Sequence, residues 1–593
     1  MTSKDLTRLR PQEIAIGIAS GLLAAVVGLA ITAALAEEAA NGLVMHFFFG
    51  AVVGISFAWL FRPAPLNYAE SLMSGLAFGL LWWVVLSLSL VPIVMGEGPQ
   101  WEVGTAASAF PALIAWLFEG ATAGLAYRVL SDAAFRYVGL PDEPVERPKD
   151  FSVRHRIVIV GGGFAGVTAA QHLERLFAGD ESVLITLVSN TNHLLFTPML
   201  SEVTAGGIEA QHIITPLRAF FRRAQVTRGE VQAIDFGKRQ VSLATDGESS
   251  LAVPFDHLVL ALGSVTSFFG LKGVEAEAFA FKSLEDAILL RNHVIEMLER
   301  ADPEPDSDKR KALVTFVVAG GGFAGTELIG GLNDFVRGSL WFYPNINPDE
   351  VSLILVHSGE RIMPELSANQ AQFAFERLKA RGVTFKLRTR LADAPPGMVM
   401  LSDGEEIRSE TVVWTAGASP HPLVRGLGLE LDQRGAVKAD ATLAVVGHCD
   451  VWAVGDCAAV LNSRTGEPCP PTAQHAVRQA ATLARNIHAV IRGGKTKPFS
   501  YRSLGSFAIL GHQTACGDVC GIRFCGLFAW WLWRTIYLLK LPSLEKKIRV
   551  ALDWTVDLFF PRDIVQTVTF RQPRKSVEAA RGMDSYVRAR KVI

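Results

Sequence analysis

Two glycine-rich segments contain the residues of this chain that are best suited to chemistry. Each follows an apolar run and has the spacing Gly-x-Gly-x-x-Gly; the glycines are Gly161, Gly163 and Gly166 in the first segment and Gly320, Gly322 and Gly325 in the second. In such a turn the first glycine permits a tight bend, the second lets the backbone approach a pyrophosphate, and the third packs a helix against a strand. The pyrophosphate then lies at the helix N-terminus, where free N–H groups favour negative charge. We therefore predict two dinucleotide-binding units.

Two such units in one polypeptide are typical of a flavin that meets a nicotinamide. In each unit an Asp or Glu is expected at the end of the second strand, where it binds the ribose 2′-hydroxyl. The first unit has Ser189 and Asn190 at this place, and the second has His357 with Arg361 close by. Because a neutral His357 beside a cation tolerates a 2′-phosphate better than a carboxylate does, NADH and NADPH both remain open.

Later segments supply the other expected contacts to a flavin. The loop Leu194–Leu200 suits the lining of an isoalloxazine ring, and Asp456 can accept hydrogen bonds from a ribityl chain. A helix that starts near Ala473 would direct its N-terminal amides at the pyrimidine oxygens and stabilise the reduced ring. Apart from the glycines above, the expected cofactor-binding residues are Phe164, Ala165, Ser189, Asn190, Thr197, Pro198, Ala261, Gly263, Phe323, His357, Gly417, Gly455, Asp456, Ala473 and Gln474.

In this order, the segments from about Arg154 to Gln566 resemble the type II NADH:quinone oxidoreductases, a family of the pyridine nucleotide-disulphide oxidoreductase superfamily. The matching sequences are GGGFAG at 161–166, LLFTPML at 194–200, ALGS at 261–264, GGGFAGTEL at 320–328, VVWTAG at 412–417, AVGDC at 453–457 and AQHAVRQ at 473–479. The resemblance implies non-covalent FAD, with NAD(P)H stacked on one face of the flavin. It also implies a quinone that reaches the other face from the membrane.

The same resemblance assigns the catalytic residues. It makes Glu327 the acid near the flavin and the nicotinamide, and it makes Gln474 the first Gln of an AQxAxQ quinone motif. Arg478 stands where that motif has its second Gln, and Gln479 follows one place later. The implied reaction is hydride transfer from NAD(P)H to FAD and electron delivery to a quinone. No proton-pumping machinery is evident in the catalytic body.

The N-terminal quarter of the chain is predicted to lie in a membrane. The whole chain is 50% hydrophobic and only 19% charged, and its net charge of −1 gives no argument for a nucleic-acid partner. Four apolar segments are long enough to be transmembrane helices, and each has small residues at Gly-x-x-x-Gly spacing; they are Ile14–Ala36, Gly42–Phe61, Ser71–Met95 and Thr105–Leu130. Glu119 lies within the last segment, where an intramembrane acid is either a functional site or a residue paired inside the bundle.

Charges in the loops predict the orientation of these helices. The basic residues Lys4, Arg8, Arg10, Arg62, Arg128 and Arg136 fall on one side, and Glu37, Glu38, Glu97 and Glu102 fall on the other. By the positive-inside rule both ends of the segment face the cytoplasm. We therefore expect a multi-pass protein of a bacterial-type inner (cytoplasmic) membrane with its catalytic body in the cytoplasm.

The expected fold class is α/β, with two Rossmann-like domains, one inserted in the other, between an N-terminal all-α transmembrane bundle and C-terminal amphipathic, membrane-associating helices. The expected boundaries are 1–140 for the bundle, 141–153 for a linker, 154–270 and 411–500 for the FAD-binding domain, 271–410 for the NAD(P)H-binding domain, 501–570 for the membrane-associating region and 571–593 for a tail. Trp-rich Leu527–Lys540 is too short to span a bilayer and, with Leu544–Phe560, favours the membrane interface. A pair of helices in a dimer interface or core is the alternative, and a homodimer stays open.

The cysteines bear on two competing functions. Cys516, Cys520 and Cys525 cluster without a fourth ligand nearby, so we predict no metal site and leave a redox role open. A sulfide:quinone oxidoreductase needs redox cysteines beside the flavin, and Cys457 has no evident partner. A membrane-anchored flavin redox sensor is the other alternative, suggested by the missing ribose carboxylates and by Arg478.

Overall fold

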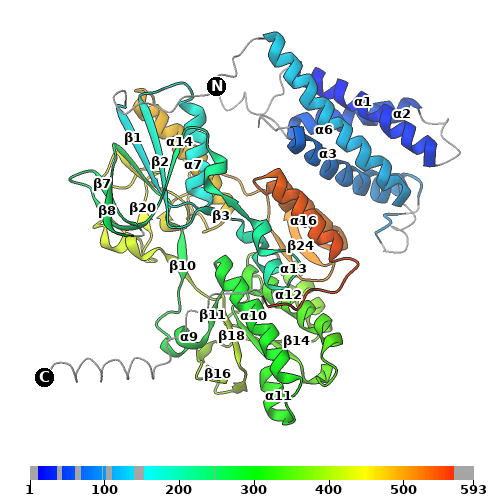
Figure 1. Ribbon diagram of the computed structural model, residues 1–593, viewed down its shortest axis with the longest axis vertical. Helices are drawn as coiled ribbons and strands as arrows, with labels where there is room; N and C mark the ends of the chain where they lie inside the picture. The colour runs from blue at the N-terminus through cyan, green and yellow to red at the C-terminus, as the bar shows by residue number, and fades with distance from the viewer. Residues whose placement is uncertain are drawn as a thin grey trace.

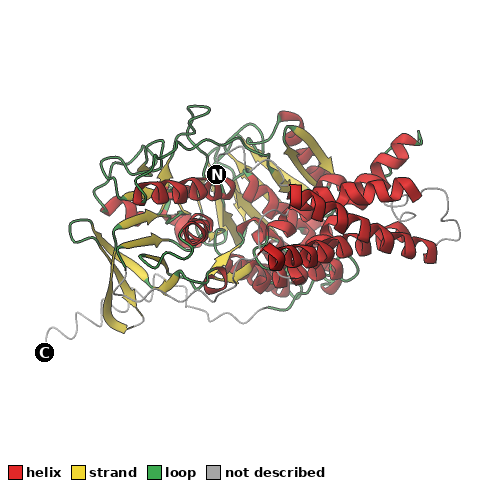
Figure 2. Cartoon of the chain, turned by 90° about the horizontal axis from the view of Figure 1, so that it is seen from above, coloured by secondary structure: helices red, strands yellow, loops and turns green. Residues whose placement is uncertain are grey.

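The computed structural model describes residues 11–35, 43–60, 68–96, 98–101, 110–138, 153–245 and 247–566. Most of the loop charges that predict the membrane orientation lie outside these residues, as do linker residues 141–152 and the tail from residue 567. The described chain forms two sheet-based units, a C-terminal layer beside them and a group of helices at one end (Figure 1). Seen from above, strands gather toward one end of the molecule and helices toward the other (Figure 2).

The first unit is a parallel sheet with the strand order β21-β9-β1-β2-β5. Its strands are β1 (His155–Val160), β2 (Val183–Ser189), β5 (Gln225–Arg228), β9 (His257–Leu260) and β21 (Val451–Ala453). Parallel strands covered on both faces read as continuous apolar runs, and Ile157–Val160 are each at most 1% exposed. Helices α7 (Phe164–Leu176) and α14 (Ala473–Ile491) pack against each other in this unit. The expected Rossmann-like unit is therefore present.

The second unit repeats this plan with the order β11-β18-β12-β13-β14. Its strands are β11 (Phe279–Ala280), β12 (Thr315–Ala319), β13 (Ser352–His357), β14 (Val383–Leu387) and β18 (Thr411–Trp414). Helices α10 (Leu284–Ala301), α12 (Phe323–Ser339) and α13 (Ala368–Ala380) contribute to its core. Each unit also has an antiparallel sheet before its last strand: β6 (Glu230–Asp235), β7 (Gln240–Thr245) and β8 (Gly247–Pro254) in the first, and β15 (Leu391–Asp393), β16 (Met398–Leu401) and β17 (Glu406–Arg408) in the second.

A short ribbon carries the chain between the two units. Strand β10 (Ser264–Thr266) leaves the first unit and pairs antiparallel with β19 (Ala418–Pro420), which returns to it. The sequence places Thr411–Trp414 in the returning part of the first domain, but this strand pairs with β12 in the second sheet. The chain therefore returns to the first unit after Trp414 rather than before Thr411, because β18 lies between β11 and β12 in the second sheet.

The C-terminal layer lies against both units. It consists of the antiparallel strands β23 (Phe507–Ile509), β24 (Ala515–Val519) and β25 (Ile522–Gly526), followed by α15 (Leu527–Lys540) and α16 (Leu544–Val556). Trp530, Trp533 and Trp554 are each at most 5% exposed and pack on Met199. Only part of the apolar surface of these helices is therefore free, and it includes Leu552 at 58% exposed.

The N-terminal region folds as a helical group. Its helices are α1 (Pro11–Leu35), α2 (Leu43–Leu60), α3 (Tyr68–Trp82) continued by η1 (Trp83–Leu90) and α4 (Val91–Val94), and α6 (Phe110–Val138). Within the described residues, Tyr68–Val94 and Ala112–Ser131 are long and apolar enough to cross a membrane, whereas Ala15–Ala30 and Phe47–Leu60 are shorter apolar helices. The expectation of four spans is thus supported for two helices.

Small residues bring these helices together as the spacing predicts. A Cβ atom on Gly21 would overlap the carbonyl oxygen of Gly50, and one on Gly75 would overlap that of Gly120. Backbones that approach this closely gain van der Waals contacts that larger side chains would prevent. The Gly-x-x-x-Gly motifs therefore pair α1 with α2 and α3 with α6.

The helical group contacts the catalytic body through α15. The rings of Trp101 and Phe528 stack with 5.1 Å between their centroids and 15° between their planes. Trp101 also donates a hydrogen bond from Nε1 to Ser89 Oγ at 3.1 Å, and Phe528 packs on the core around Trp83 and Leu88. In Figure 1 the helices of this group lie beside α16, away from the strands of the first sheet. The N-terminal helices therefore adjoin the helices that were expected at the membrane interface.

Candidate active site

The first glycine-rich turn has the geometry of a pyrophosphate cradle. Strand β1 ends at Val160, and α7 begins at Phe164 with Gly163 as its N-cap. Gly161 has φ +120°, and a Cβ there would overlap the carbonyl oxygen of Ala261, while one on Gly166 would overlap that of Gly161. A Cβ on Gly163, by contrast, would meet no atom within 4 Å. The turn is therefore packed on its inner side and open on its outer side, in front of the amides of α7, which is where an FAD pyrophosphate fits.

A polar cluster lies where the first sheet meets the crossing ribbon. Ser264 donates a hydrogen bond from Oγ to Asp456 Oδ2 at 2.6 Å, and Lys282 donates from Nζ to Ser264 Oγ at 2.6 Å. Burial lowers the pKa of Lys282, and the negative charge of Asp456 opposes this shift. The predicted ligand Asp456 is thus held in a fixed orientation by two residues that sequence analysis did not select. Two sequence features could have pointed to these residues: Ser264 directly follows the predicted ligand Gly263, and Lys282 directly precedes the helix N-cap Ser283.

The helix α14 supports the same cluster. Its N-cap Thr472 accepts a hydrogen bond from the backbone N–H of His475 at 3.5 Å. Gln479 is 2% exposed, and its Oε1 accepts the backbone N–H of Gly455 at 2.8 Å. Gly455 itself has φ +75°, which a residue with a side chain rarely adopts. Gln479 therefore fixes the turn that presents Asp456.

The predicted quinone residues face the C-terminal segment. Gln474 donates from Nε2 to Ser503 Oγ at 3.2 Å and to the Gly505 carbonyl at 3.3 Å, and it accepts from Tyr501 Oη at 2.9 Å. Arg478 is exposed and lies over the ring of Tyr501, with 5.7 Å between Cζ and the ring centroid. These residues come together on one side of α14, where Gln474 ties the helix to residues 501–505.

The second glycine-rich turn repeats the geometry of the first, but the neighbouring strand β13 ends in His357, where β2 of the first unit ends in Ser189. Helix α12 begins at Phe323 with Gly322 as its N-cap, and Gly320 has φ +118°. His357 Nδ1 accepts a hydrogen bond from the backbone N–H of Gly321 at 3.1 Å. Burial lowers the pKa of His357, with Glu365 opposing the shift. A ring nitrogen that accepts a hydrogen bond carries no proton, so His357 is held neutral in this turn.

A carboxylate that the motif analysis missed stands beside this turn. Glu365 Oε1 would be 3.4 Å from a Cβ placed on Gly322. Arg361, which the sequence placed near the ribose, instead donates from its guanidinium to the Pro364 carbonyl at 3.1 Å. A carboxylate is absent from the end of β13, but Glu365, eight residues after His357, lies beside the second glycine-rich turn.

Glu327 lies on α12 and is enclosed where this helix meets the C-terminal layer. Its Oε1 accepts a hydrogen bond from the backbone N–H of Ile509 at 3.1 Å. Burial raises the pKa of Glu327 to about 8; the Ile509 hydrogen bond opposes the rise and the charge of Glu202 adds to it. The carboxyl is thus mainly protonated at neutral pH, as a group that holds and releases a proton requires.

Buried polar and aromatic side chains surround this carboxyl. Trp554 donates from Nε1 to Glu202 Oε2 at 2.5 Å, and burial raises the pKa of Tyr537, with Glu327 adding to the rise. Arg534 is 7% exposed and stacks on Trp530 at 3.8 Å from Cζ to the ring centroid and on Trp554 at 4.8 Å. Burial lowers the pKa of Arg534 to about 10, and Glu202 and Asp557 oppose that shift. Acid, base and aromatic groups from α8 (Leu200–Thr204), α12, α15 and α16 thus meet in one largely buried region.

The remaining predicted contacts lie around the two turns. Thr197 and Pro198 form a short 3-10 turn before α8, and Phe164 of α7 contacts Phe196 of that loop edge to face. Ala261 is 5% exposed and donates its N–H to the Val160 carbonyl, as β9 does along the sheet.

Gly263 has φ +70° with open space at its Cβ position, and a Cβ on Gly417 would overlap the Ser267 carbonyl. Ser189 is 5% exposed, with its Oγ accepting the Thr191 N–H at 3.3 Å, and Asn190 is exposed.

Cys457, next to Asp456, is enclosed. Its Sγ donates weak hydrogen bonds to the carbonyls of Val454 at 3.4 Å and Leu260 at 3.5 Å. Burial raises its pKa to about 11, so the thiol stays protonated. Since a thiolate is the reactive form of cysteine, this position does not suit redox chemistry on sulfur. Among the described residues, no group of three or more His, Cys, Asp or Glu side chains is arranged to hold a metal ion.

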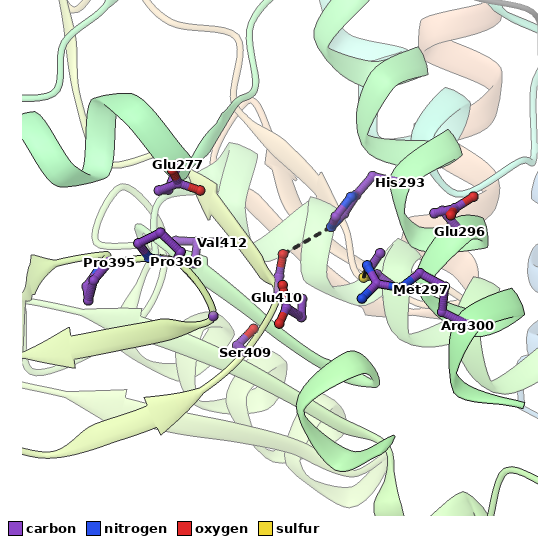
Figure 3. Close-up of a pocket in the computed structure, with 11 residues that line it drawn as sticks. Glu277, His293, Glu296, Met297, Arg300, Pro395, Pro396, Ser409, Glu410 and Val412 are labelled. Carbon is purple, nitrogen blue, oxygen red and sulfur yellow. Dashed lines mark hydrogen bonds between the residues drawn. The ribbon is translucent and has the colours of Figure 1, made fainter. Parts of the chain in front are cut away.

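A cavity lies away from these residues. It has a volume of about 210 Å³ and is lined by α10, by the segment 395–412 and by Glu277 at the end of α9 (Lys272–Glu277), with Glu296, Arg300 and Glu410 among its residues (Figure 3). His293 lies at its rim with Nε2 3.2 Å from the Glu410 carbonyl oxygen and 3.0 Å from Thr411 Oγ1. None of the predicted cofactor residues is among those that line it, so we do not assign the chemistry to this cavity.

Comparison with known proteins agrees with this geometry. Residues 155–480 match the model of the pyridine nucleotide-disulphide oxidoreductase family, and residues 503–563 match the NDH2 C-terminal domain. The chain is 32% identical over 445 residues to the type II NADH:quinone oxidoreductase Ndh of Mycobacterium tuberculosis, an alignment that covers 72% of this chain and 93% of the relative. The chain belongs to the type II NADH:quinone oxidoreductase family. Both family matches begin after residue 154, so the helices of residues 11–138 lie outside the matched residues.

Other relatives and solved structures extend the likeness. The chain is 28% identical over 462 residues to the internal alternative NAD(P)H-ubiquinone oxidoreductase A1 of Arabidopsis thaliana mitochondria, with 72% of this chain and 88% of that one covered. The structure of NDH2 from Plasmodium falciparum in complex with NADH superposes with a TM-score of 0.65 at 18% identity, covering 69% of this chain and 99% of the other. At that identity the second comparison shows the shared fold, a mixed α/β fold of the NDH2 type.

Proposed function

We propose that this type II NADH:quinone oxidoreductase takes a hydride from NADH and delivers the electrons to a membrane quinone. The family uses FAD, NADH and a quinone. FAD, when bound, accepts the hydride from the nicotinamide and passes two electrons to the quinone. The observation that carries the proposal is the half-buried Glu327. Its helix, α12, starts at the second dinucleotide cradle, and the Glu327 carboxyl binds the backbone of the C-terminal layer at Ile509.

In this proposal the residues of the first unit hold FAD. The amides at the start of α7 bind the pyrophosphate, and Asp456, fixed by Ser264 and Lys282, binds the ribityl hydroxyls. The amides at the start of α14 face the pyrimidine oxygens and stabilise negative charge there. Because these groups are fixed before the cofactor binds, they orient the ring at little entropic cost.

Glu327 and its neighbours serve the proton. The protonated carboxyl of Glu327 donates a proton toward the reacting oxygen of the quinone and then takes up a new proton from solvent, to which its half-buried side chain is open. Tyr537, Trp530 and Trp554 cover the rest of this region. The pKa of about 8 places this group close to the operating pH, where acid–base catalysis is most effective.

The coenzyme in this proposal is NADH rather than NADPH. Glu365 beside Gly322 presents a carboxylate to the adenosine ribose, which accepts a hydrogen bond from a 2′-hydroxyl and repels a 2′-phosphate. His357 is neutral because it accepts the Gly321 N–H, and the guanidinium of Arg361 is directed at the Pro364 carbonyl. His357 therefore offers no positive charge to a 2′-phosphate.

The protein lies against the membrane through its C-terminal and N-terminal helices. Leu552, Val556, Phe559 and Phe560 are between 54% and 77% exposed near α16, and the spans Tyr68–Val94 and Ala112–Ser131 adjoin this surface. We extend this to a multi-pass anchor in which α1 and α2 also cross the bilayer, with the catalytic body in the cytoplasm of a bacterial-type cell. Quinone then reaches α15 from the lipid without crossing water.

Purification in mild detergent followed by two assays tests the proposal. We expect a yellow protein whose absorbance bleaches rapidly with NADH and slowly with NADPH, and which reduces a ubiquinone or menaquinone analogue at steady state. Sulfide-dependent quinone reduction without a nicotinamide would overturn the assignment, although the enclosed Cys457 does not support that activity. Bleaching without turnover would instead favour a flavin sensor.

A further inference from the structure

A pair of cysteines faces each other across the C-terminal hairpin. Cys516 on β24 is the register partner of Cys525 on β25, and their sulfur atoms are 3.1 Å apart. Cys516 is fully buried beside Leu510, whereas Cys525 is partly exposed. The proposed hydride and proton transfer uses neither thiol.

The backbone of this hairpin allows the two sulfurs to join. Asp518 donates its N–H to Ser506 and Cys520 donates its N–H to Leu504, so alternate residues of β24, including Cys516, direct their backbone groups away from β25. Cys516 and Cys525 therefore form a non-hydrogen-bonded pair, in which opposite Cα atoms are about 4.5 Å apart. That separation lies at the near end of the range of disulfides, and closing the sulfurs to about 2.05 Å needs side-chain rotation rather than strand movement.

The pair lies between the second dinucleotide unit and the quinone side. Gln370 of α13 donates from Nε2 to the Gly517 carbonyl at 2.6 Å, next to Cys516. Strand β23, which pairs with β24, provides the Ile509 N–H that Glu327 accepts. Strand β25 runs directly into α15 through Gly526, whose φ of +84° marks a sharp change of direction. A bond across β24 and β25 thus acts on the start of the helix that packs around Glu327.

We infer that Cys516 and Cys525 form a reversible disulfide that slows quinone reduction in an oxidising cell, an effect on rate that rests on the proposed function. A hydrogen bond from the Cys516 thiol lowers the pKa of Cys525, so the partly exposed sulfur is the one that attacks. With glutathione disulfide as oxidant, the Cys525 thiolate displaces one glutathione thiolate and forms a mixed disulfide. Once Cys525 is held in the mixed disulfide, Cys516 loses the hydrogen bond to the Cys525 thiol that contributes most to raising its pKa. Cys516 then gives up its proton, attacks the Cys525 sulfur as a thiolate and releases the second glutathione, which takes that proton. Two electrons and two protons leave the protein, and two glutathione molecules carry them.

The test uses the detergent-purified full chain, incubated with glutathione disulfide and then mapped as peptides by mass spectrometry without reduction. We expect a Cys516–Cys525 linkage that dithiothreitol removes. Cys516→Ser should trap a glutathione adduct on Cys525, and Cys525→Ser should abolish the linkage. Cys520→Ser, at the exposed tip of the same hairpin, is the matched control and should behave as wild type. Absence of the linkage in wild type, or linkages mainly through Cys520, overturns the inference whether or not the protein turns over quinone.

Two rates separate the disulfide from the proposed function. Oxidised wild type should reduce a quinone analogue about fivefold more slowly, because the linkage holds the start of α15 in one position, while flavin reduction by NADH in stopped flow stays unchanged. Cys516→Ser should lose this sensitivity. A linkage that forms without altering the quinone rate overturns the regulatory part. A protein that bleaches with neither coenzyme, before or after oxidation, refutes the proposed function and leaves the mass-spectrometric test standing.

Discussion

The carboxyl group of Glu327 accepts a hydrogen bond from the backbone N–H of Ile509, with 3.1 Å between oxygen and nitrogen. These residues are 182 positions apart in the chain. One belongs to the helix that follows the second dinucleotide cradle, and the other belongs to the strand beside α15. The bond therefore connects the helix of the second dinucleotide cradle with the C-terminal layer at a single ionisable group.

Glu327→Gln should lower NADH:quinone turnover by about 100-fold, the usual loss when a positioned proton donor is removed. FAD should remain bound, because the cradle of the first unit is untouched and the amide oxygen still accepts the Ile509 N–H. Steady-state oxidation of NADH and the absorbance of bound flavin check both expectations. Loss of the flavin in this variant would contradict the role given to Glu327.

The same variant should alter the dependence of stability on pH. The pKa of Glu327 is raised from 4.5 to about 8 in the fold, so the folded chain binds this proton more tightly than the unfolded chain. Its contribution to stability is therefore complete below the unfolded pKa and is lost as pH rises toward 8, at up to about 1.4 kcal/mol per pH unit. Stability should therefore fall as pH rises from about 5 to about 8, roughly the interval between the two pKa values. In Glu327→Gln, thermal unfolding should show a smaller fall over this interval. An unchanged slope would show that this carboxyl is not the cause.

Asp456→Asn should reduce FAD retention by about tenfold or more, because a charge-assisted hydrogen bond becomes a neutral one and the half-buried Lys282 loses its counter-charge. Equilibrium dialysis against free FAD measures the effect. Asp450→Asn is a control, since Asp450 lies on the same approach to β21 but pairs with Arg239 at the surface. Equal losses in both variants would indicate a general effect on folding.

The sequence predicts the two cradles well because their glycines act locally. A positive φ at Gly161 and Gly320, and backbone contact at Gly166, follow from the spacing alone. The side chains that complete the site do not. Trp554 and Glu202 are 352 positions apart, and only the packing of α16 on α8 brings them together.

Helix geometry explains what happens at the end of the quinone motif. One step along a helix turns a side chain by about 100°. Arg478 is consequently exposed over Tyr501, while Gln479 points inward and binds Gly455. A motif match that treats neighbouring positions as interchangeable would therefore give Gln479 the role of the second quinone-motif Gln. In the structure, Gln479 instead fixes the turn at Gly455.

Glu365→Gln should raise the ratio of kcat/KM for NADPH to that for NADH by about tenfold, because it removes one negative charge beside the expected 2′-phosphate and leaves the shape unchanged. Glu360→Gln is the matched control, since Glu360 pairs with Arg388 at the surface nearby. Steady-state kinetics with both coenzymes measures the ratio. A ratio that moves equally in the two variants would reject Glu365 as the discriminating group.

Arg534→Met should destabilise the protein by about 3 kcal/mol, since it removes the positive charge that interacts with the buried carboxyl of Glu202. The double variant Arg534→Met with Glu202→Gln should recover most of this loss, because no unpaired charge then remains. Thermal or denaturant unfolding of the four proteins of the cycle gives the coupling free energy. Additive losses in the double variant would show that the two side chains do not act on each other.

Gly50→Leu tests whether the N-terminal helices are separate from the chemistry. A Cβ on Gly50 would lie 2.6 Å from the Ala25 Cβ and 2.9 Å from the Gly21 carbonyl oxygen, so a larger side chain forces α1 and α2 apart. Overpacking of this kind costs about 1–3 kcal/mol, and it should lower the unfolding temperature of the helical group in detergent. Phe48→Leu is the control, because Phe48 is 58% exposed on the same helix. Flavin reduction by NADH should be the same in both variants, since α1 and α2 contribute no residue to either cradle. A slower reduction in Gly50→Leu alone would show that these helices act on hydride transfer after all.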